Sequence, residues 1–462
     1  MRRADDRRGG PESIGKIRNE NISGKARRGG AFLVSGHAYV FRMEDGMRTV
    51  YGNVLVGQSG GPTAAINATL AGVIRGVFAA EKKGLVGKLY GMRHGIEGCL
   101  EGKLVDLTER FRRNGNPESE LKLLETTPAA ALGSCRTKLP DPEKDPAVFE
   151  DLARIFEEYQ IRTFFYIGGN DSMDTVAKLE RYFARHDYEI RIVGVPKTID
   201  NDLCGTDHTP GYGSAAKYVA ATVREMICDT SVYTVRSVTI AEIMGRDAGW
   251  LTAASACAGF GDGTAPDLIC LPERVFDTEK FLERIRRAWE THPNVMVAVS
   301  EGVRFADGTY VGAGCQNGVR DNFGHQYLSG TGKVLEALCR ERLGCKVRSV
   351  ELNIPQRCAG HLASACDLRE SSAIGRLAVM AAIRGQSGVM ASFRRTSDKP
   401  YRIRLETVPV SLVATKVRTV PDEYISEDGF GVTEAFLDYV RPLITGEARA
   451  LFRDGVPTHF RL

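Results

Sequence analysis

Residues 162–172 read RTFFYIGGNDS. An apolar run of strand length that ends in two glycines and then in polar residues is typical of a buried strand passing through a tight turn into a helix. Residues 190–202, IRIVGVPKTIDND, repeat this order and place a lysine and two carboxylates where the strand should end. Because open α/β sheets bind ligands in the loops at the carboxyl ends of their strands, we predict that both loops belong to one site.

Other parts of the chain repeat this passage from strand to loop. Apolar runs of β-prone residues occur at 53–57, 238–243 and 295–299. The first leads through QSGGPT into a helix-like stretch at 64–80, and the other two lead into MGR and SEG. Such alternation indicates largely parallel sheets flanked by helices. We expect an α/β fold with two Rossmann-like three-layer domains facing an active-site cleft, since 462 residues exceed one doubly wound domain.

The expected domain boundaries follow from these runs and from composition. Residues 1–46 form a basic tail that we expect to be disordered, because it is rich in glycine and arginine and lacks apolar periodicity. An alternative is that Met43 or Met47 is the true start and the tail is an artefact of the gene model. The body is expected to comprise an N-terminal α/β domain at 47–200, a second at 201–370 with the chain crossing between them, and C-terminal helices and strands at 371–462 that pack back on both.

Charge and composition exclude several classes of protein. Residues 1–30 contain nine basic and four acidic residues and carry a charge of +5, so with a net charge of +4 for the whole chain the remaining residues sum to −1 and form a nearly neutral body. A neutral body argues against a fold that binds nucleic acid. The chain has no apolar run long enough to span a membrane and no apolar segment placed like that of a signal peptide. We therefore expect a cytoplasmic protein with neither nucleic-acid nor membrane partners.

Cysteine and histidine spacing gives no sign of a transition-metal site. The eleven cysteines include no Cys-x-x-Cys pair, and the eight histidines include no His-x-x-x-His pair. Reduced, buried thiols are therefore the better interpretation than a zinc site or a disulfide framework.

The strand-end loops contain the groups that phosphoryl transfer requires. Glycines let backbone N–H groups approach phosphates, a lysine supplies positive charge, and carboxylates can bind Mg²⁺ and accept a proton. Each loop also has a purely structural interpretation, as a glycine turn or as a cluster of Asx turns. The pattern Gly-x-x-x-x-Gly-Lys-Ser/Thr is absent from the sequence, which disfavours a P-loop nucleotidase. Taken together, the loops indicate a kinase that acts on a small phosphorylated substrate.

The order and spacing of these motifs resemble the phosphofructokinase family, over roughly residues 53–405. The motifs that carry the resemblance are Gly60-Gly61-Pro62, Gly133-Ser134-Cys135-Arg136, Gly168-Gly169-Asn170-Asp171, Pro196 to Asp202, Met244-Gly245-Arg246, Glu301 and Gln356-Arg357. The resemblance implies that fructose 6-phosphate is phosphorylated on its 1-hydroxyl, that Mg²⁺ is required, and that the first domain binds the phosphoryl donor and the second the sugar phosphate. It also implies a homo-oligomer, expected to be a homodimer, with a tetramer as the second choice.

Two positions bear on the identity of the donor. Members of the family that use ATP typically have Gly-Gly-Asp-Gly and Pro-Gly-Thr-Ile-Asp, whereas this chain has Asp171 in place of the last glycine and Lys197 before Thr198. A carboxylate at 171 would repel the α-phosphate of a nucleotide, by about 1–4 kcal/mol for unit charges about 4 Å apart. Lys197 would instead attract a free pyrophosphate. The chain thus resembles the pyrophosphate-dependent branch of the family, whose reaction is reversible.

The resemblance implies a role for each motif residue. Asp200 would be the general base, Thr198 would orient the reacting groups, and Glu301 would hold sugar hydroxyls. The implied catalytic residues are Asp200, Thr198, Lys197, Asp171 and Arg246, and the implied pyrophosphate-binding residues are Gly60, Gly61, Arg136, Gly169 and Lys197. The implied sugar-phosphate residues are Thr198, Ile199, Asp200, Met244, Gly245, Arg246, Glu301, Arg348 and Arg357, and the metal residues are Asn170 and Asp202.

The chain departs from the family pattern at three positions. Asn170 stands where many members have a metal-associated Asp, although an amide oxygen can still bind Mg²⁺. Ile354 replaces a histidine that normally contacts the sugar, so Asn353 or His361 would take over that contact. Arg236, a candidate for a neighbouring subunit's phosphate site, is offset by one residue from its usual position.

Three other functions stay open. An ATP-dependent phosphofructokinase would share the fold and the acceptor. A non-catalytic regulatory subunit that binds sugar phosphates would be expected to lose the base, whereas Asp200 is present. Lipid and NAD kinases have a similar glycine loop but lack the Thr-Ile-Asp-Asn-Asp and Met-Gly-Arg motifs.

Overall fold

The computed structural model describes residues 30–34, 37–41, 50–113, 115–315 and 330–462, and the chain divides into two units, 1–46 and 47–462. In the first unit, strands β1 (Gly30–Val34) and β2 (His37–Phe41) pair in antiparallel register. The apolar, β-prone residues of these two strands favour such pairing, and disorder of the tail stays a prediction. The rest of the predicted tail lies outside the described residues.

A seven-stranded sheet forms one half of the second unit, in the order β13-β12-β7-β6-β3-β4-β5. Its five inner strands are mutually parallel, and the strands at both edges are antiparallel to their neighbours. The strands are β3 (Asn53–Gln58), β4 (Leu89–Met92), β5 (Leu104–Asp106), β6 (Ile161–Gly168), β7 (Arg191–Pro196), β12 (Val389–Asp398) and β13 (Tyr401–Pro409). This sheet therefore combines β3, from the N-terminal part of the second unit, with β12 and β13 from its C-terminal part.

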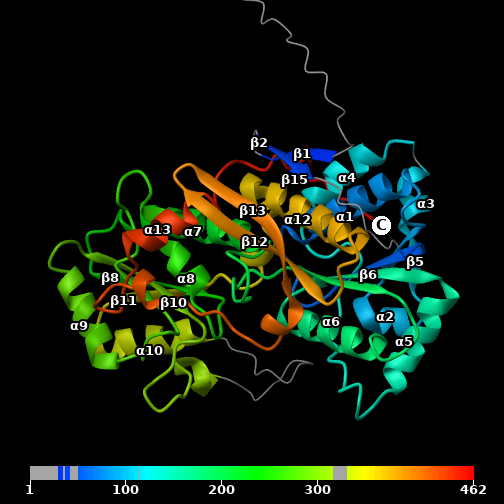
Figure 1. Ribbon diagram of the computed structural model, residues 1–462. Coiled ribbons are helices and arrows are strands. Elements are labelled where there is room, and N and C mark those ends of the chain that lie inside the picture. Colours follow the sequence, from blue (N-terminus) through cyan, green and yellow to red (C-terminus); the bar gives the residue numbers. More distant parts are fainter. Residues whose placement is uncertain (1–29, 35–36, 42–49, 114, 316–329) are drawn as a thin grey trace, which may run out of the picture. The chain divides into compact units, whose positions relative to one another are not determined.

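A four-stranded, fully parallel sheet forms the other half, in the order β11-β8-β10-β9. The strands are β8 (Ser237–Ile243), β9 (Leu268–Cys270), β10 (Asn294–Ser300) and β11 (Lys346–Glu351). Figure 1 shows the two sheets at opposite ends of the second unit, with β6 and β5 at one end and β8, β10 and β11 at the other. A short hairpin of β14 (Phe452–Arg453) and β15 (Val456–Pro457) lies near the C-terminus.

Helices cover both faces of each sheet (Figure 1). On the seven-stranded sheet, α1 (Ile66–Glu81), α4 (Pro117–Glu125) and α12 (Ala365–Ile383) pack on one face, and α2 (Gly95–Leu100), α5 (Ala147–Glu158) and α6 (Asn170–Phe183) on the other. On the four-stranded sheet, α7 (Tyr212–Thr230), α8 (Trp250–Ala254) and α13 (Glu434–Val440) oppose α9 (Thr278–Ala288) and α10 (Thr331–Leu343). The remaining helices are α3 (Leu107–Arg112), α11 (Pro355–Cys358) and 3₁₀ turns at Ser255–Gly259, Val311–Cys315, Gly360–Leu362, Val410–Leu412 and Asp422–Tyr424.

The predicted α/β class with largely parallel sheets is confirmed. The helix expected at 64–80 runs over Ile66–Glu81, and in the turn before it the Thr63 hydroxyl accepts hydrogen bonds from the N–H groups of Ala65 and Ile66. Both sheets are built from separate stretches of sequence, and the domain boundaries given above stay a prediction.

Among the described residues, neither the helices nor the cysteines indicate a membrane span or a disulfide framework. None of their helices combines the length and the apolar character needed to cross a membrane. Their cysteines are free thiols, and six of them are buried, as expected; Cys204, Cys345 and Cys358 are partly exposed and Cys228 is exposed.

Candidate active site

The carboxyl ends of strands from both sheets open into one cavity of about 570 Å³. The loops after β3, β6 and β7 line it from the seven-stranded sheet, and the loops after β8, β10 and β11 line it from the four-stranded sheet. The two loops on which the sequence prediction rested, after β6 and after β7, therefore do belong to one site. They meet there because neighbouring parallel strands end at the same edge of a sheet.

Most of the predicted site residues line this cavity. They are Gly60, Gly61, Arg136, Gly169, Asn170, Asp171, Lys197, Thr198, Ile199, Asp200, Asp202, Met244, Arg246, Glu301 and Arg357. Gly245 lies just behind the wall, where its N–H group donates to Glu301 Oε1 over 3.3 Å.

Within the single chain, Arg348 lies outside the cavity, and its role in binding phosphate stays a prediction. This residue lies on β11, at the edge of its sheet, and its side chain is exposed rather than part of the cavity wall. Arg348 stands three residues before the end of the strand, whereas the cavity is lined by residues at and beyond the strand ends. Arg357 lines the cavity and Arg348 does not, so the two arginines do not share one cavity within the chain.

The structure also places unpredicted residues in the wall. Of the two replacements considered for the family histidine, Asn353 lines the cavity and His361 does not. Glu242 is a buried carboxylate near the end of β8. An acidic residue in a largely apolar strand indicates a functional site, so the sequence could have revealed this residue. The cavity is also lined by Asp247, Glu351 and Val417. The sequence does not predict that Val417 belongs to the site, because this residue comes from a distant segment of the chain.

Glycines bring two cations close to the backbone at the end of β3. Lys197 Nζ donates to the carbonyl oxygen of Gly61 over 2.7 Å. A Cβ atom at Gly60, whose φ is +75°, would lie 3.2 Å from that Nζ, and one at Gly61 would lie 3.6 Å from Arg357 Nη1. Side chains at these positions would fill the space beside both cations, so the glycines keep it open to a ligand.

The charge of Lys197 depends on its surroundings. Burial lowers the pKa of Lys197 to about 8, although the nearby carboxylates of Asp200 and Asp202 act in the opposite direction. Arg357 offers a second positive group, and its Nε is buried without a hydrogen-bond partner among the described residues. Both groups would be stabilised by an anion in the cavity, because buried cations are costly unless they are paired.

The turn after β7 presents two half-buried carboxylates to the cavity. Asp200 Oδ2 accepts a hydrogen bond of 3.2 Å from the Thr198 hydroxyl, which itself accepts one from the Asp200 N–H group. Burial raises the pKa of Asp200, and burial together with the charge of Asp200 raises the pKa of Asp202 to about 7. A carboxyl group with a raised pKa is suited to accept a proton near neutral pH.

The surroundings of Asn170 fit a magnesium ion. Its Nδ2 donates to Asp202 Oδ2 over 3.3 Å, and its Oδ1 is buried with no hydrogen-bond partner among the described residues. Carboxylate and amide oxygens are the protein ligands that Mg²⁺ prefers, with water and substrate phosphates completing its coordination. No cluster of three His, Cys, Asp or Glu residues suited to a metal occurs in the described part of the chain, so an ion here would need such additional ligands.

On the opposite side of the cavity, Glu301 is the central acidic group. Burial raises its pKa to about 8, although the hydrogen bond from the Gly245 N–H group opposes this. The loop after β11 is tied to the loop after β8, because Gln356 Oε1 accepts a hydrogen bond of 3.2 Å from the Met244 N–H group. Residues from two strand ends therefore form one continuous wall.

Comparisons with known proteins bear on what this cavity does. Residues 53–382, well over half of the chain, match the phosphofructokinase family. The chain belongs to this family. It is 41% identical, over 89% of its length and 96% of the relative's, to the pyrophosphate–fructose 6-phosphate 1-phosphotransferase of Xanthomonas campestris.

Solved structures of phosphofructokinases agree with this assignment. The chain superposes on the pyrophosphate-dependent phosphofructokinase of Marinobacter aquaeolei with a TM-score of 0.78 and 35% identity, covering 89% of this chain and 96% of the other. For the corresponding enzyme of Nitrosospira multiformis the TM-score is 0.79 at 35% identity, covering 88% and 96%.

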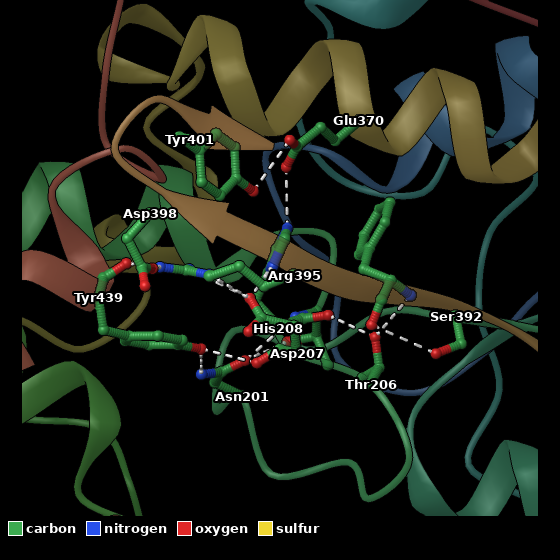
Figure 2. A network of polar contacts seen from close by, with 12 residues as sticks. Asn201, Thr206, Asp207, His208, Glu370, Ser392, Arg395, Asp398, Tyr401 and Tyr439 are labelled. Atoms are coloured by element: carbon green, nitrogen blue, oxygen red, sulfur yellow. Dashed lines mark hydrogen bonds and ion pairs between the residues drawn. The ribbon is translucent and has the colours of Figure 1, made fainter. Parts of the chain in front are cut away.

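In this member of the phosphofructokinase family, a buried polar network lies behind the turn after β7 (Figure 2). His208 is held between Asp207 Oδ1 and Glu370 Oε2, each 2.8 Å from a ring nitrogen. Arg395 donates to the same oxygen of Asp207, and the Tyr401 hydroxyl donates to Glu370 Oε1. The network joins the segment after β7 to α12 and β12.

This network predicts a pH dependence of stability. Burial alone would lower the pKa of His208, but Glu370 and Asp207 outweigh it and raise the pKa from 6.5 to about 9. The stabilisation is therefore complete below pH 6.5 and lost as the pH rises through 9, and is worth about 3 kcal/mol. We expect the difference between the urea denaturation midpoints of the wild type and His208→Gln to be larger at pH 6 than at pH 9.5, where only the contacts of the neutral ring, such as its stacking on Phe393, still distinguish the two proteins. A gap that is the same at both pH values would show that His208 is neutral in the folded protein.

Proposed function

We propose that this protein transfers a phosphoryl group from pyrophosphate to the 1-hydroxyl of fructose 6-phosphate, giving fructose 1,6-bisphosphate and phosphate. The observation that carries the proposal is the presence of Asp171, Lys197 and Asp200 in one cavity formed by strand ends from both sheets. The names of the relatives point to the same pair of substrates. The free energies of the pyrophosphate bond and of the new ester are similar, so the reaction is expected to be reversible.

The donor would bind among the loops of the seven-stranded sheet. Lys197, Arg136 and the backbone around Gly60 and Gly61 surround this part of the cavity, with Gly169 beside them. They offer positive charge and N–H groups to a compact anion. Negative charge develops on the leaving phosphate as the bridging P–O bond breaks, and Lys197 and Arg246 would stabilise it.

Asp171 would make the choice between donors. It lies in the first turn of α6 and forms an ion pair of 3.3 Å with Lys138, both side chains being partly exposed. An exposed pair of this kind cancels little of the carboxylate's effect on a neighbouring phosphate. A nucleotide would bring its α-phosphate towards this negative group, whereas free pyrophosphate has no α-phosphate and avoids the repulsion.

The acceptor would bind on the side of the four-stranded sheet. Glu301 would accept hydrogen bonds from sugar hydroxyls, and Arg357 and Arg246 would bind phosphate groups, with Ile199, Met244 and Gly245 shaping the wall. Asp200 would take the proton from the 1-hydroxyl as its oxygen forms the new bond to phosphorus, with Thr198 orienting the reacting groups. Asn353 is the candidate for the contact that a histidine normally supplies.

Asn170 and Asp202 would hold Mg²⁺, which when bound neutralises phosphate charge during transfer. We also propose a homodimer that acts in the cytoplasm. In such a dimer, the exposed side chain of Arg348 would be available to a neighbouring subunit rather than to its own cavity.

Initial rates with fructose 6-phosphate and Mg²⁺ test the proposal, with pyrophosphate or ATP supplied at equal concentration. We expect turnover with pyrophosphate and at least about tenfold less with ATP, since repulsion of about 1.4 kcal/mol already corresponds to that ratio. Turnover with ATP alone would agree with the family assignment but would contradict the proposal that pyrophosphate is the donor. Silence with both donors would favour a regulatory subunit, and a panel of other acceptors would then be tried.

A further inference from the structure

A residue outside the matched span 53–382 holds the turn that contains the proposed base. Arg418 follows β13, and its Nε and Nη2 donate to the carbonyl oxygen of Asn201 over 3.2 and 3.0 Å. Its Nη1 donates to the carbonyl oxygens of Thr206 and Asp207 over 2.8 and 2.6 Å. One guanidinium group therefore joins three backbone carbonyls of the segment that follows β7.

The backbone of Arg418 adds to this attachment, and Trp250 fixes its position. The Arg418 N–H group donates to the carbonyl oxygen of Asp202 over 2.7 Å. The guanidinium lies 4.5 Å from the centre of the Trp250 ring, and Trp250 Nε1 donates to the Arg418 carbonyl oxygen over 2.9 Å. Trp250 is almost fully buried, so Arg418 is supported by the core of the four-stranded sheet.

Tyr439, on α13, makes a second attachment to the same turn (Figure 2). Its hydroxyl accepts a hydrogen bond of 2.9 Å from Asn201 Nδ2 and donates one of 2.8 Å to the carbonyl oxygen of Asp207. Arg418 Nη2 also approaches this hydroxyl, at 3.4 Å. The side chain and the backbone of Asn201 are thus both held from behind the cavity.

The backbone conformation of the turn links its two carboxylates. Asn201 has a φ of +54°, in the left-handed region that asparagine adopts more readily than most residues with a side chain. Asn201 lies between Asp200 and Asp202, so a change of its backbone would move both carboxylates. Neither Arg418 nor Tyr439 lines the cavity, so neither would touch a substrate.

We infer that Arg418 and Tyr439 are positioning residues that hold the Asn201 turn so that Asp200 and Asp202 face the cavity. The inference rests on the proposed function for the role of Asp200 and adds two residues to it. A misplacement of about 1 Å in a reacting group can cost about 10²-fold in rate, so the attachment has a measurable consequence.

Two small substitutions test the inference. Arg418→Lys keeps the charge but cannot reach three carbonyls at once, and Tyr439→Phe removes only the hydroxyl. We expect each to lower kcat by about 10- to 100-fold while the KM for fructose 6-phosphate changes by less than about threefold. Arg274→Lys is the matched control, because Arg274 binds Asp422 of the same C-terminal segment but none of residues 198–207. Its kcat should stay within about twofold of the wild type.

A double-mutant cycle separates positioning from general stability. If Arg418 acts through Asp200 and Asp202, Arg418→Lys should lower the residual kcat of the double variant Asp200→Ser/Asp202→Asn by less than about threefold. A full 10- to 100-fold loss in that background would overturn the inference, because it would show that Arg418 supports activity by another route. An unchanged kcat in both single variants would overturn it as well.

Amide hydrogen exchange tests the same inference without substrate. Exchange at residues 198–202 should be at least about tenfold faster in Arg418→Lys than in the wild type or Arg274→Lys, because the turn loses backbone contacts. If the wild type fails to use fructose 6-phosphate and pyrophosphate, the proposed function fails while this measurement still decides whether Arg418 holds the turn. Equal exchange in all three proteins would overturn the inference.

Discussion

Replacing Asp200 with serine should lower kcat by about 10²–10⁴-fold, the loss expected when a general base is removed. Asp200 is half-buried in the cavity wall and hydrogen-bonded to Thr198, and desolvation raises its pKa. The affinity for fructose 6-phosphate, measured by calorimetry without donor, should change little. The base acts on the reacting proton, whereas binding depends mainly on phosphate and hydroxyl contacts elsewhere in the cavity.

Asp247→Ser is the control for removing a carboxylate from this cavity. Asp247 lines the wall but is exposed and paired with Arg304, so its kcat should stay within about threefold of the wild type. A kcat of Asp200→Ser equal to that of Asp247→Ser would remove Asp200 from the role of base. Loss of sugar binding in Asp200→Ser would instead make it a binding residue.

Replacing Asp171 with glycine should weaken the use of pyrophosphate and allow some use of ATP. The change removes negative charge from the first turn of α6 and leaves Lys138 free to contact a phosphate. If repulsion of about 1–4 kcal/mol is relieved, kcat/KM for ATP should rise at least about tenfold. The measurement is kcat/KM for both donors at fixed Mg²⁺ and saturating fructose 6-phosphate.

Two further variants show how much of the gain with ATP comes from removing the charge of Asp171 and how much from removing its side chain. Asp171→Asn keeps the shape of the side chain without its charge, and Asp174→Asn removes a carboxylate from the same helix that pairs with Lys178 and does not line the cavity. We expect Asp171→Asn to show part of the gain with ATP and Asp174→Asn to show none. If kcat/KM is unchanged for both donors in Asp171→Gly, the donor is chosen elsewhere in the cavity.

The sequence predicted the site well where local patterns decide structure. Glycine and polar residues after apolar runs marked the ends of β3, β6, β7, β8 and β10, and parallel pairing brings such ends together. The helix after Gly169 shows the predicted apolar side, with Met173, Val176 and Leu179 fully buried. Strand and helix periodicity are local properties, so a short window is enough to find them.

Contacts between distant segments were beyond such reasoning. Nothing near Arg418 in the sequence indicates that its side chain meets Asn201, because that contact requires both sheets to be assembled first. Arg348 lies outside the cavity of its own chain for a related reason. Spacing along the chain placed it beside Arg357, but the pairing order puts β11 at the edge of its sheet and leaves the side chain exposed.

The position of β12 has a consequence for how this protein is made. β7, which carries the Lys197–Asp202 turn, pairs on one side with β12, about two hundred residues later in the chain. At about 5–20 residues per second, ribosomes need about 10–40 s to cover that distance. Throughout this time the backbone groups of β7 on that side face no partner strand, and unpaired strand edges promote aggregation. Until β12 has been made, aggregation through this edge competes with folding, so the risk of aggregation grows with the concentration of unfinished chains.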